Sequence, residues 1–280
     1  GKLREGNSII GKPEEAKYGV TREQIGKAYK MMRDKGVKRF GLHTMIASNE
    51  LNPQFFIKTG EMLFDLIGEL SSEVGIKFEF VNLGGGIGIP YRPEQIPVDL
   101  NEVSQGIKNA YDKKIVANGL APLRVVMENG RMVTGPNGFL VTSVRHVMKK
   151  HRDFVGVDAC MANLMRPGMY GAYHPITVLE KRNHPKTHIY DVVGSLCEGI
   201  DKFAINRPLP EITPGDTLAI HCCGAHSYAM GFQYNGKLRC AEFLIDNGVT
   251  EMIRRAETPE DYFSTHDFPS GEFSFLAHKS

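Results

Sequence analysis

The sequence has no tryptophan, few cysteines and no apolar run of the roughly 18 residues that a membrane-spanning helix needs. The five cysteines are an odd number, and no two of them form a C-x-x-C pair. This pattern argues against a disulfide framework and against a structural zinc site, and it favours free thiols in a reducing compartment. We therefore expect a cytoplasmic protein without a membrane span.

A strong charge bias is also absent. The 34 Lys plus Arg residues nearly balance the 32 Asp plus Glu residues, which argues against a broad basic surface for nucleic acid. The hydrophobic fraction of 41% is typical of a folded globular chain. The N-terminal stretch is charged and lacks the apolar core of a signal peptide. Because residue 1 is Gly rather than Met, we expect the sequence to start at a cut or processing site.

The first half of the chain alternates between helical and strand patterns. Helices are expected over residues 22–35, from Asn52-Pro53 onward and over 98–117, with strands over 38–43, 77–83 and 124–127. This order is typical of βαβ units and a parallel sheet. Polar or glycine-rich residues follow each strand, as in Ser48-Asn49, Gly84-Gly85-Gly86 and the 128–131 segment. Since ligands bind at the carboxyl ends of parallel strands, one shared site is expected there.

From about residue 140 the sequence pattern changes, and helical spacing gives way to short alternating segments. Short strands broken by Pro, Gly and Asn are expected over residues 154–158, 188–193, 216–222 and 238–244. The Asn235-Gly236 pair predicts a hairpin between its flanking segments. A short helix is expected over 258–263. This half therefore predicts an antiparallel β domain.

The glycine cluster from Gly84 to Gly88 follows a predicted strand, so its backbone N–H groups could cradle a phosphate. A tight turn that needs positive φ is the alternative, and the two are evenly balanced on the pattern alone. Pro90 and Pro93 deny the immediate helix that a dinucleotide-binding fold requires.

Two further segments combine charged residues with glycine or proline. Glu128-Asn129-Gly130-Arg131 could hold a protonated heterocycle through its carboxylate and an anion through its guanidinium. In isolation, such a segment is more often a surface turn. The run from Arg166 to His174 offers Arg and Tyr side chains suited to a carboxylate, or it is a turn with tyrosines as packing.

Cys197 lies beside Glu198 and near Asp201, and these carboxylates disfavour a thiolate. A neutral thiol that donates a proton is one alternative, and simple packing is the other. A lone His226 in Gly224-Ala225-His226 is more often structural than catalytic. H-E-x-x-H, G-x-S-x-G and Walker A motifs are absent from the sequence.

Taken in order, these segments resemble the pyridoxal-phosphate-dependent group IV decarboxylases, and within them the diaminopimelate decarboxylases. The resemblance is carried by GLHTMIASN, NLGGGIGIPY, ENGR, VDACMANLMRPGMYGAYH, VVGSLCEGID and GAHSYAMGFQYNGKLR, which together extend over most of the chain. It implies an alanine-racemase-like (β/α)₈ barrel followed by an antiparallel β-sandwich or β-barrel domain. On this reading, residues 1–145 form part of the barrel without its first strands, and residues 146–280 form the β domain.

The same resemblance implies a role for individual residues. The residues implied around pyridoxal phosphate are Ser48, Gly85, Gly86, Glu128, Gly130, Arg131 and His226, with Glu128 at the ring nitrogen. The residues implied to bind the amino-acid substrate are Arg131, Arg166, Tyr170 and Glu198, the last at its distal ammonium. Cys197 is the implied catalytic proton donor, acting across a homodimer with shared active sites. No metal is implied.

The sequence departs from the family pattern at several positions. Met45 stands where a cofactor-stacking histidine is usual, Asn129 replaces a proline and His226 replaces a tyrosine. No lysine of this sequence corresponds to the lysine that forms the Schiff base in the family. Lys17 matches a family segment that follows that lysine in the chain. The resemblance implies decarboxylation of meso-2,6-diaminopimelate to L-lysine, with this chain inactive alone. A decarboxylase of carboxynorspermidine, ornithine or arginine is an alternative, as is a non-catalytic binding protein.

Overall fold

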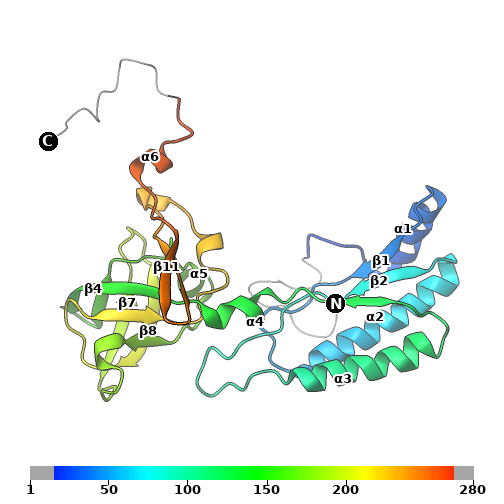
Figure 1. The fold of residues 1–280 in the computed structure, drawn as a ribbon, viewed down its shortest axis with the longest axis horizontal. Coiled ribbons are helices and arrows are strands. Elements are labelled where there is room, and N and C mark those ends of the chain that lie inside the picture. The colour runs from blue at the N-terminus through cyan, green and yellow to red at the C-terminus, as the bar shows by residue number, and fades with distance from the viewer. Residues whose placement is uncertain (1–15, 268–280) are drawn as a thin grey trace. The chain divides into compact units, whose positions relative to one another are not determined.

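The computed structural model describes residues 16–267, which divide into two compact units (Figure 1). Of the described residues, the first unit comprises 16–141 together with Tyr170–Thr177 and Ala219–His226. The second comprises Thr142–Met169, Val178–Leu218 and residues 227–267. Within the described residues, no helix has the length and apolar character needed to cross a membrane.

A parallel three-stranded sheet, in the order β1-β2-β3, forms the centre of the first unit. Its elements are α1 (Arg22–Asp34), β1 (Phe40–His43), α2 (Pro53–Val74), β2 (Phe78–Asn82), α3 (Leu100–Tyr111), β3 (Arg124–Val126) and α4 (Gly130–Thr134). This arrangement confirms the predicted βαβ order, with strand ends shifted by one or two residues. Helix α3 is shorter than expected, because Asp112–Val116 continues it as a π-helical turn.

Capping residues, a proline and a glycine set the ends of helix α2. Asn52 caps α2 by accepting a hydrogen bond from the Gln54 N–H at 3.0 Å, and Pro53 occupies the first turn, where its missing N–H costs nothing. Gly75 ends the helix in the left-handed conformation at φ 71°. Helices α2 and α3 run side by side along the sheet (Figure 1). Phe64, Ile67 and Leu70 of α2 are at most 1% exposed in the core between helix and sheet.

A six-stranded sheet, in the order β6-β9-β4-β5-β7-β8, dominates the second half of the chain. Its strands are β4 (Leu140–Lys149), β5 (Asp153–Val157), β6 (Ile176–Val178), β7 (His188–Val193), β8 (Lys202–Leu209) and β9 (Thr217–Ile220). The expectation of a purely antiparallel domain is wrong, because β5 and β7 pair in parallel. The long connection between them, which includes the short helix α5 (Arg166–Tyr170), gives the chain room to return in the same direction.

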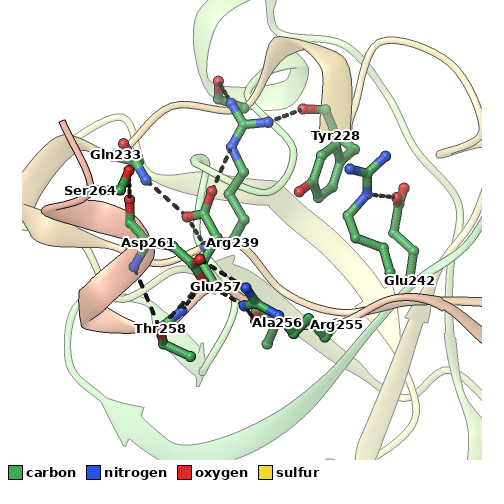
Figure 2. Close-up of polar contacts among 12 residues, drawn as sticks. Tyr228, Gln233, Arg239, Glu242, Arg255, Ala256, Glu257, Thr258, Asp261 and Ser264 are labelled. Carbon is green, nitrogen blue, oxygen red and sulfur yellow. Dashed lines mark hydrogen bonds and ion pairs between the residues drawn. The ribbon is translucent and has the colours of Figure 1, made fainter.

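The hairpin predicted at Asn235-Gly236 is wrong. Both residues have positive φ, at 56° and 66°, but they form a 3₁₀ turn, Tyr234–Gly236. Gln233 Nε2 and the Arg239 N–H both donate to Glu257 Oε2 at 2.9 Å, so both flanking segments bind a third segment and do not pair as two strands (Figure 2). The hairpin lies further along, where Asn247 and Gly248 join β10 (Glu242–Asp246) to β11 (Val249–Arg254). The last predicted helix is confirmed as α6 (Pro259–Tyr262), capped by Thr258.

Candidate functional site

The carboxyl ends of β1, β2 and β3 lie side by side, because His43 is in register with Asn82 and Asn82 with Val126. The exposed Glu128 follows β3 at this edge. Asn82 Nδ2 donates to Glu128 Oε1 at 2.6 Å, while Asn82 Oδ1 accepts the Gly84 N–H at 2.9 Å. His43 Nε2 lies 3.8 Å from the same Oε1. Both contacts use Oε1, so Oε2 keeps its capacity to accept a bond from a ligand.

The loops after β1 and β2 are joined by backbone hydrogen bonds. The Glu50 N–H donates to the Gly86 carbonyl at 2.9 Å, and the Gly88 N–H donates to the Glu50 carbonyl at 2.8 Å. Gly84 and Gly86 have φ of 75° and 92°, the tight-turn geometry that the glycine cluster allowed. This pairing holds the Ser48 segment against the glycine-rich loop.

Gly85 lies at a close backbone approach between the loops after β2 and β3. A Cβ atom added there would lie 2.1 Å from the Glu128 carbonyl oxygen, which is backbone and has little freedom to move. We expect Gly85→Ala to lower the free energy of unfolding by about 1–3 kcal/mol, because the loop after β2 and the segment after β3 must separate. Urea denaturation measures this loss.

A matched control lies in helix α2 of the same unit. A Cβ at Gly68 would meet its nearest atom, Leu120 Cδ1, at an ordinary 3.8 Å. Gly68→Ala should therefore raise stability by up to about 1 kcal/mol through helix propensity. Equal effects of the two substitutions would contradict the close approach assigned to Gly85.

Arg131 is the central cation of the site. It lies on α4 and is 8% exposed. Its guanidinium donates from Nη2 to Ser48 Oγ at 3.2 Å and from Nη1 to the Tyr91 hydroxyl at 3.1 Å. A guanidinium held beside a hydroxyl is a donor set suited to a phosphate or carboxylate.

The residues before Arg131 leave room at this position. A Cβ at Gly130 would have nothing within 4 Å, so the first turn of α4 faces open space. Asn129 Oδ1 is buried without a hydrogen-bond partner among the described residues. An unsatisfied buried acceptor next to an open glycine is a feature that a bound polar group could complete.

Two later segments of the chain join the first unit. Their contacts bring His174 against Tyr91, with ring centroids 5.0 Å apart, and the Tyr173 ring beneath the Arg92 guanidinium at 4.6 Å. His174 is fully buried, and its Nδ1 lies 2.8 Å from the His221 carbonyl, so Nδ1 carries the proton. Tyr170 is half-buried at the end of α5.

His226 is exposed in the last of these segments. It has φ 58°, and it follows Gly224, whose N–H donates to the Gly135 carbonyl at 3.1 Å. Gly135 begins the turn after α4, so this segment packs beside the helix that carries Arg131. Ser48, Gly85, Gly86, Glu128, Gly130 and Arg131 thus gather at one sheet edge, with Tyr170 and His226 in the same unit.

Arg166, Cys197 and Glu198 belong to the second unit. Arg166 is 5% exposed on α5, whereas Cys197 and Glu198 are exposed in the loop between β7 and β8. A Cβ at Gly168 would lie 2.4 Å from the Ile200 carbonyl oxygen, so α5 packs closely on this loop. The structure therefore brings the arginine segment and the cysteine loop together within that unit.

Several residues in these contacts had no assigned role in the sequence analysis. Among them are Asn82, Tyr91 and His174, all within the segments that carried the resemblance. For Asn82 a signal was available, because it is a polar residue at the carboxyl end of a strand. Buried partners such as Tyr91 give no comparable local signal, since their contacts join segments 40 residues apart.

Comparison with known proteins gives a consistent result. The model of the family described as "Pyridoxal-dependent decarboxylase, C-terminal sheet domain" matches residues 44–224. Protein TabA of Pseudomonas amygdali pv. tabaci is 41% identical over 257 residues, which cover 91% of this chain and 60% of that protein. Diaminopimelate decarboxylase of Methanothermobacter thermautotrophicus is 38% identical and is matched over 92% of this chain and 60% of its own length.

Solved structures agree with these relatives. The crystal structure of diaminopimelate decarboxylase from M. jannaschii, in co-complex with L-lysine, superposes with a TM-score of 0.83 at 31% identity. The match covers 91% of this chain and 59% of that one. The chain thus spans about 60% of the length of the curated relatives that it matches.

Proposed function

Because the chain belongs to the pyridoxal-dependent decarboxylases, we propose that its full gene product decarboxylates meso-2,6-diaminopimelate to L-lysine and CO₂. The observation that carries the proposal is the buried Arg131 guanidinium, held by Ser48 and Tyr91 at the same sheet edge as Glu128. A phosphate and a protonated ring nitrogen are the two groups that such an arrangement suits.

The residues at this edge fit pyridoxal phosphate. Ser48, Gly85, Gly86, Gly130 and Arg131 would hold its phosphate, and the open space at Gly130 beside the Arg131 guanidinium supports that fit. Glu128 would keep a proton on the ring nitrogen, and His226 would donate one further hydrogen bond. The cofactor supplies an electron sink for the carbon that loses CO₂.

The remaining residues are assigned to the substrate. Arg131, Arg166 and Tyr170 would bind the carboxylate that is retained, and Glu198 would bind the distal ammonium. Cys197 would return a proton from its Sγ to the carbon that has lost CO₂. The structure of the M. jannaschii relative in complex with L-lysine supports L-lysine as the product.

The proposal includes the architecture expected from the sequence. Residues up to about 145 would contribute to a (β/α)₈ barrel and residues 146–280 to a β-sandwich or β-barrel domain. The active protein would be a cytoplasmic homodimer with shared active sites. Since the chain lacks the family's Schiff-base lysine, we propose that the 280 residues alone bind the cofactor without turning over substrate.

Cofactor binding tests the phosphate assignment in the 280-residue chain itself. Arg131→Met should weaken the binding of pyridoxal phosphate about tenfold to a hundredfold, because a charge-assisted hydrogen bond is lost. The affinity for pyridoxal, which lacks the phosphate, should stay unchanged. Equilibrium dialysis with both ligands measures the two affinities.

The control is Arg39→Met, which removes an exposed guanidinium that pairs with Glu79 away from the site. That variant should bind both ligands as the unsubstituted chain does. An Arg131→Met chain that binds pyridoxal phosphate with unchanged affinity would overturn the phosphate site.

A further inference from the structure

Asp201 is a buried carboxylate beside two exposed candidate functional side chains. It is 2% exposed, whereas Cys197 and Glu198, four and three residues before it, are exposed. A charged group taken out of water needs polar partners, because its lost hydration is otherwise uncompensated. The partners of Asp201 therefore indicate what its burial achieves.

Its two carboxylate oxygens accept hydrogen bonds from two different segments. Oδ1 accepts the Met161 N–H at 2.7 Å, and Oδ2 accepts the Leu196 N–H at 2.8 Å. Leu196 directly precedes Cys197 in the loop between β7 and β8. Met161 lies in the segment that leads to Arg166 and α5. One carboxylate thus bridges the cysteine loop and the arginine segment.

The backbone of Asp201 closes the loop as well. Its carbonyl accepts the Gly194 N–H at 2.9 Å, and its N–H donates to the Glu198 carbonyl at 3.1 Å. A Cβ at Gly194 would lie 2.3 Å from the Asp201 Oδ2, so only glycine allows the carboxylate to occupy this position. The loop of residues 194–201 is therefore built around this side chain.

Burial raises the pKa of Asp201, and the Leu196 and Met161 N–H groups partly offset that rise. Of the charged groups that act on it, Lys237 lowers the pKa and Glu198 raises it. Burying a charged carboxylate costs free energy. The burial of Asp201 is therefore better explained by the two segments that its oxygens join than by a net gain in stability.

We propose that Asp201 is a positioning residue that fixes Cys197 and Glu198 relative to Arg166. The proposal rests on the function proposed above for those three side chains. Asn in place of Asp has only one acceptor oxygen, so its amide accepts from Met161 or from Leu196 but not from both. Either orientation breaks the bridge and leaves one buried N–H without its partner.

Hydrogen exchange of the 280-residue chain tests the bridge without cofactor or substrate. In Asp201→Asn, the amides of residues 194–200 should exchange about tenfold faster, as the loss of one buried hydrogen bond requires. The matched control is Asp216→Asn, which changes another buried carboxylate that accepts the Thr213 N–H and pairs with Lys181 in the same unit. That control should leave exchange in residues 194–200 unchanged.

A second variant and a second measurement keep the test decisive. Gly194→Ala should displace the carboxylate and give the same local loss of protection, so it replaces Asp201→Asn if that chain does not fold. A nitroxide attached to Cys197, with Cys222 and Cys240 changed to Ser, should become more mobile in both variants but not in Asp216→Asn. Unchanged exchange and unchanged nitroxide mobility would overturn the positioning role.

These readouts separate the two proposals. If the full gene product does not decarboxylate diaminopimelate while Asp201→Asn still loosens residues 194–200, the function fails and the bridge stands. If decarboxylation occurs but the loop is as protected in Asp201→Asn as in Asp216→Asn, the bridge fails and the function stands.

Discussion

Replacing Cys197 by alanine should slow the decarboxylation of meso-diaminopimelate by the full gene product about 10²–10⁴-fold, the range expected when a general acid is removed. Cys197 is exposed, so its Sγ can reach a bound substrate rather than pack in a core. Alanine keeps the backbone of the loop but has no proton to give. Without that donor, the carbon that has lost CO₂ must take its proton from water.

The measurement is the rate of CO₂ release at saturating substrate. Cys240→Ala is the matched control, because Cys240 is the other exposed thiol of the second unit and has no assigned role. The control should keep full activity. Unchanged turnover in Cys197→Ala would remove Cys197 from the mechanism while leaving the cofactor assignments untouched.

Replacing Glu128 by glutamine should lower turnover about 10²–10³-fold, the effect typical of losing one preorganised electrostatic contact. Asn82 Nδ2, which donates to Glu128 Oε1 at 2.6 Å, can donate equally well to an amide oxygen. The local geometry at the strand ends is therefore kept. A neutral amide, however, does not hold a proton on the ring nitrogen of the cofactor, so the electron sink is weakened.

Cofactor affinity separates this effect from a loss of binding. Pyridoxal phosphate should still bind the Glu128→Gln protein through Arg131 and Ser48, so dialysis should give an affinity within a few-fold of the original. The control is Glu61→Gln, which changes an exposed carboxylate on α2. Turnover equal to that of the control would contradict the role assigned to Glu128.

The parts of the fold set by local chemistry could be predicted from the sequence. Helix α2 begins at Pro53 after the Asn52 cap, as predicted, because capping and proline geometry act within a few residues. The predicted gathering of strand ends is also confirmed, since parallel strands in register bring His43 and Asn82 to one edge. Position along a strand was enough to predict which residues meet at this edge.

Features set by contacts between distant segments were predicted less well. The Asn235-Gly236 pair has the backbone angles of a hairpin turn, but Glu257 binds the residues on both sides of it. The turn signal therefore described the local backbone correctly and the strand pairing wrongly. The parallel pairing of β5 with β7 was missed for a related reason, because alternating patterns do not specify strand direction.

The supporting residues of the site show the same limit. Glu128 and Arg131 could be selected as candidates because charged side chains follow a strand. Tyr91, the partner of Arg131, becomes visible only when segments 40 residues apart come together. The roles assigned to the candidate residues stay predictions, and the variants above address them one at a time.

Substrate competition in the full gene product tests the central claim most directly. CO₂ release would be measured with meso-diaminopimelate alone and then with carboxynorspermidine, ornithine or arginine as the competitor. We predict that meso-diaminopimelate is the preferred substrate and that L-lysine is its product. Preference for any of the three competitors, or the absence of L-lysine, would contradict it.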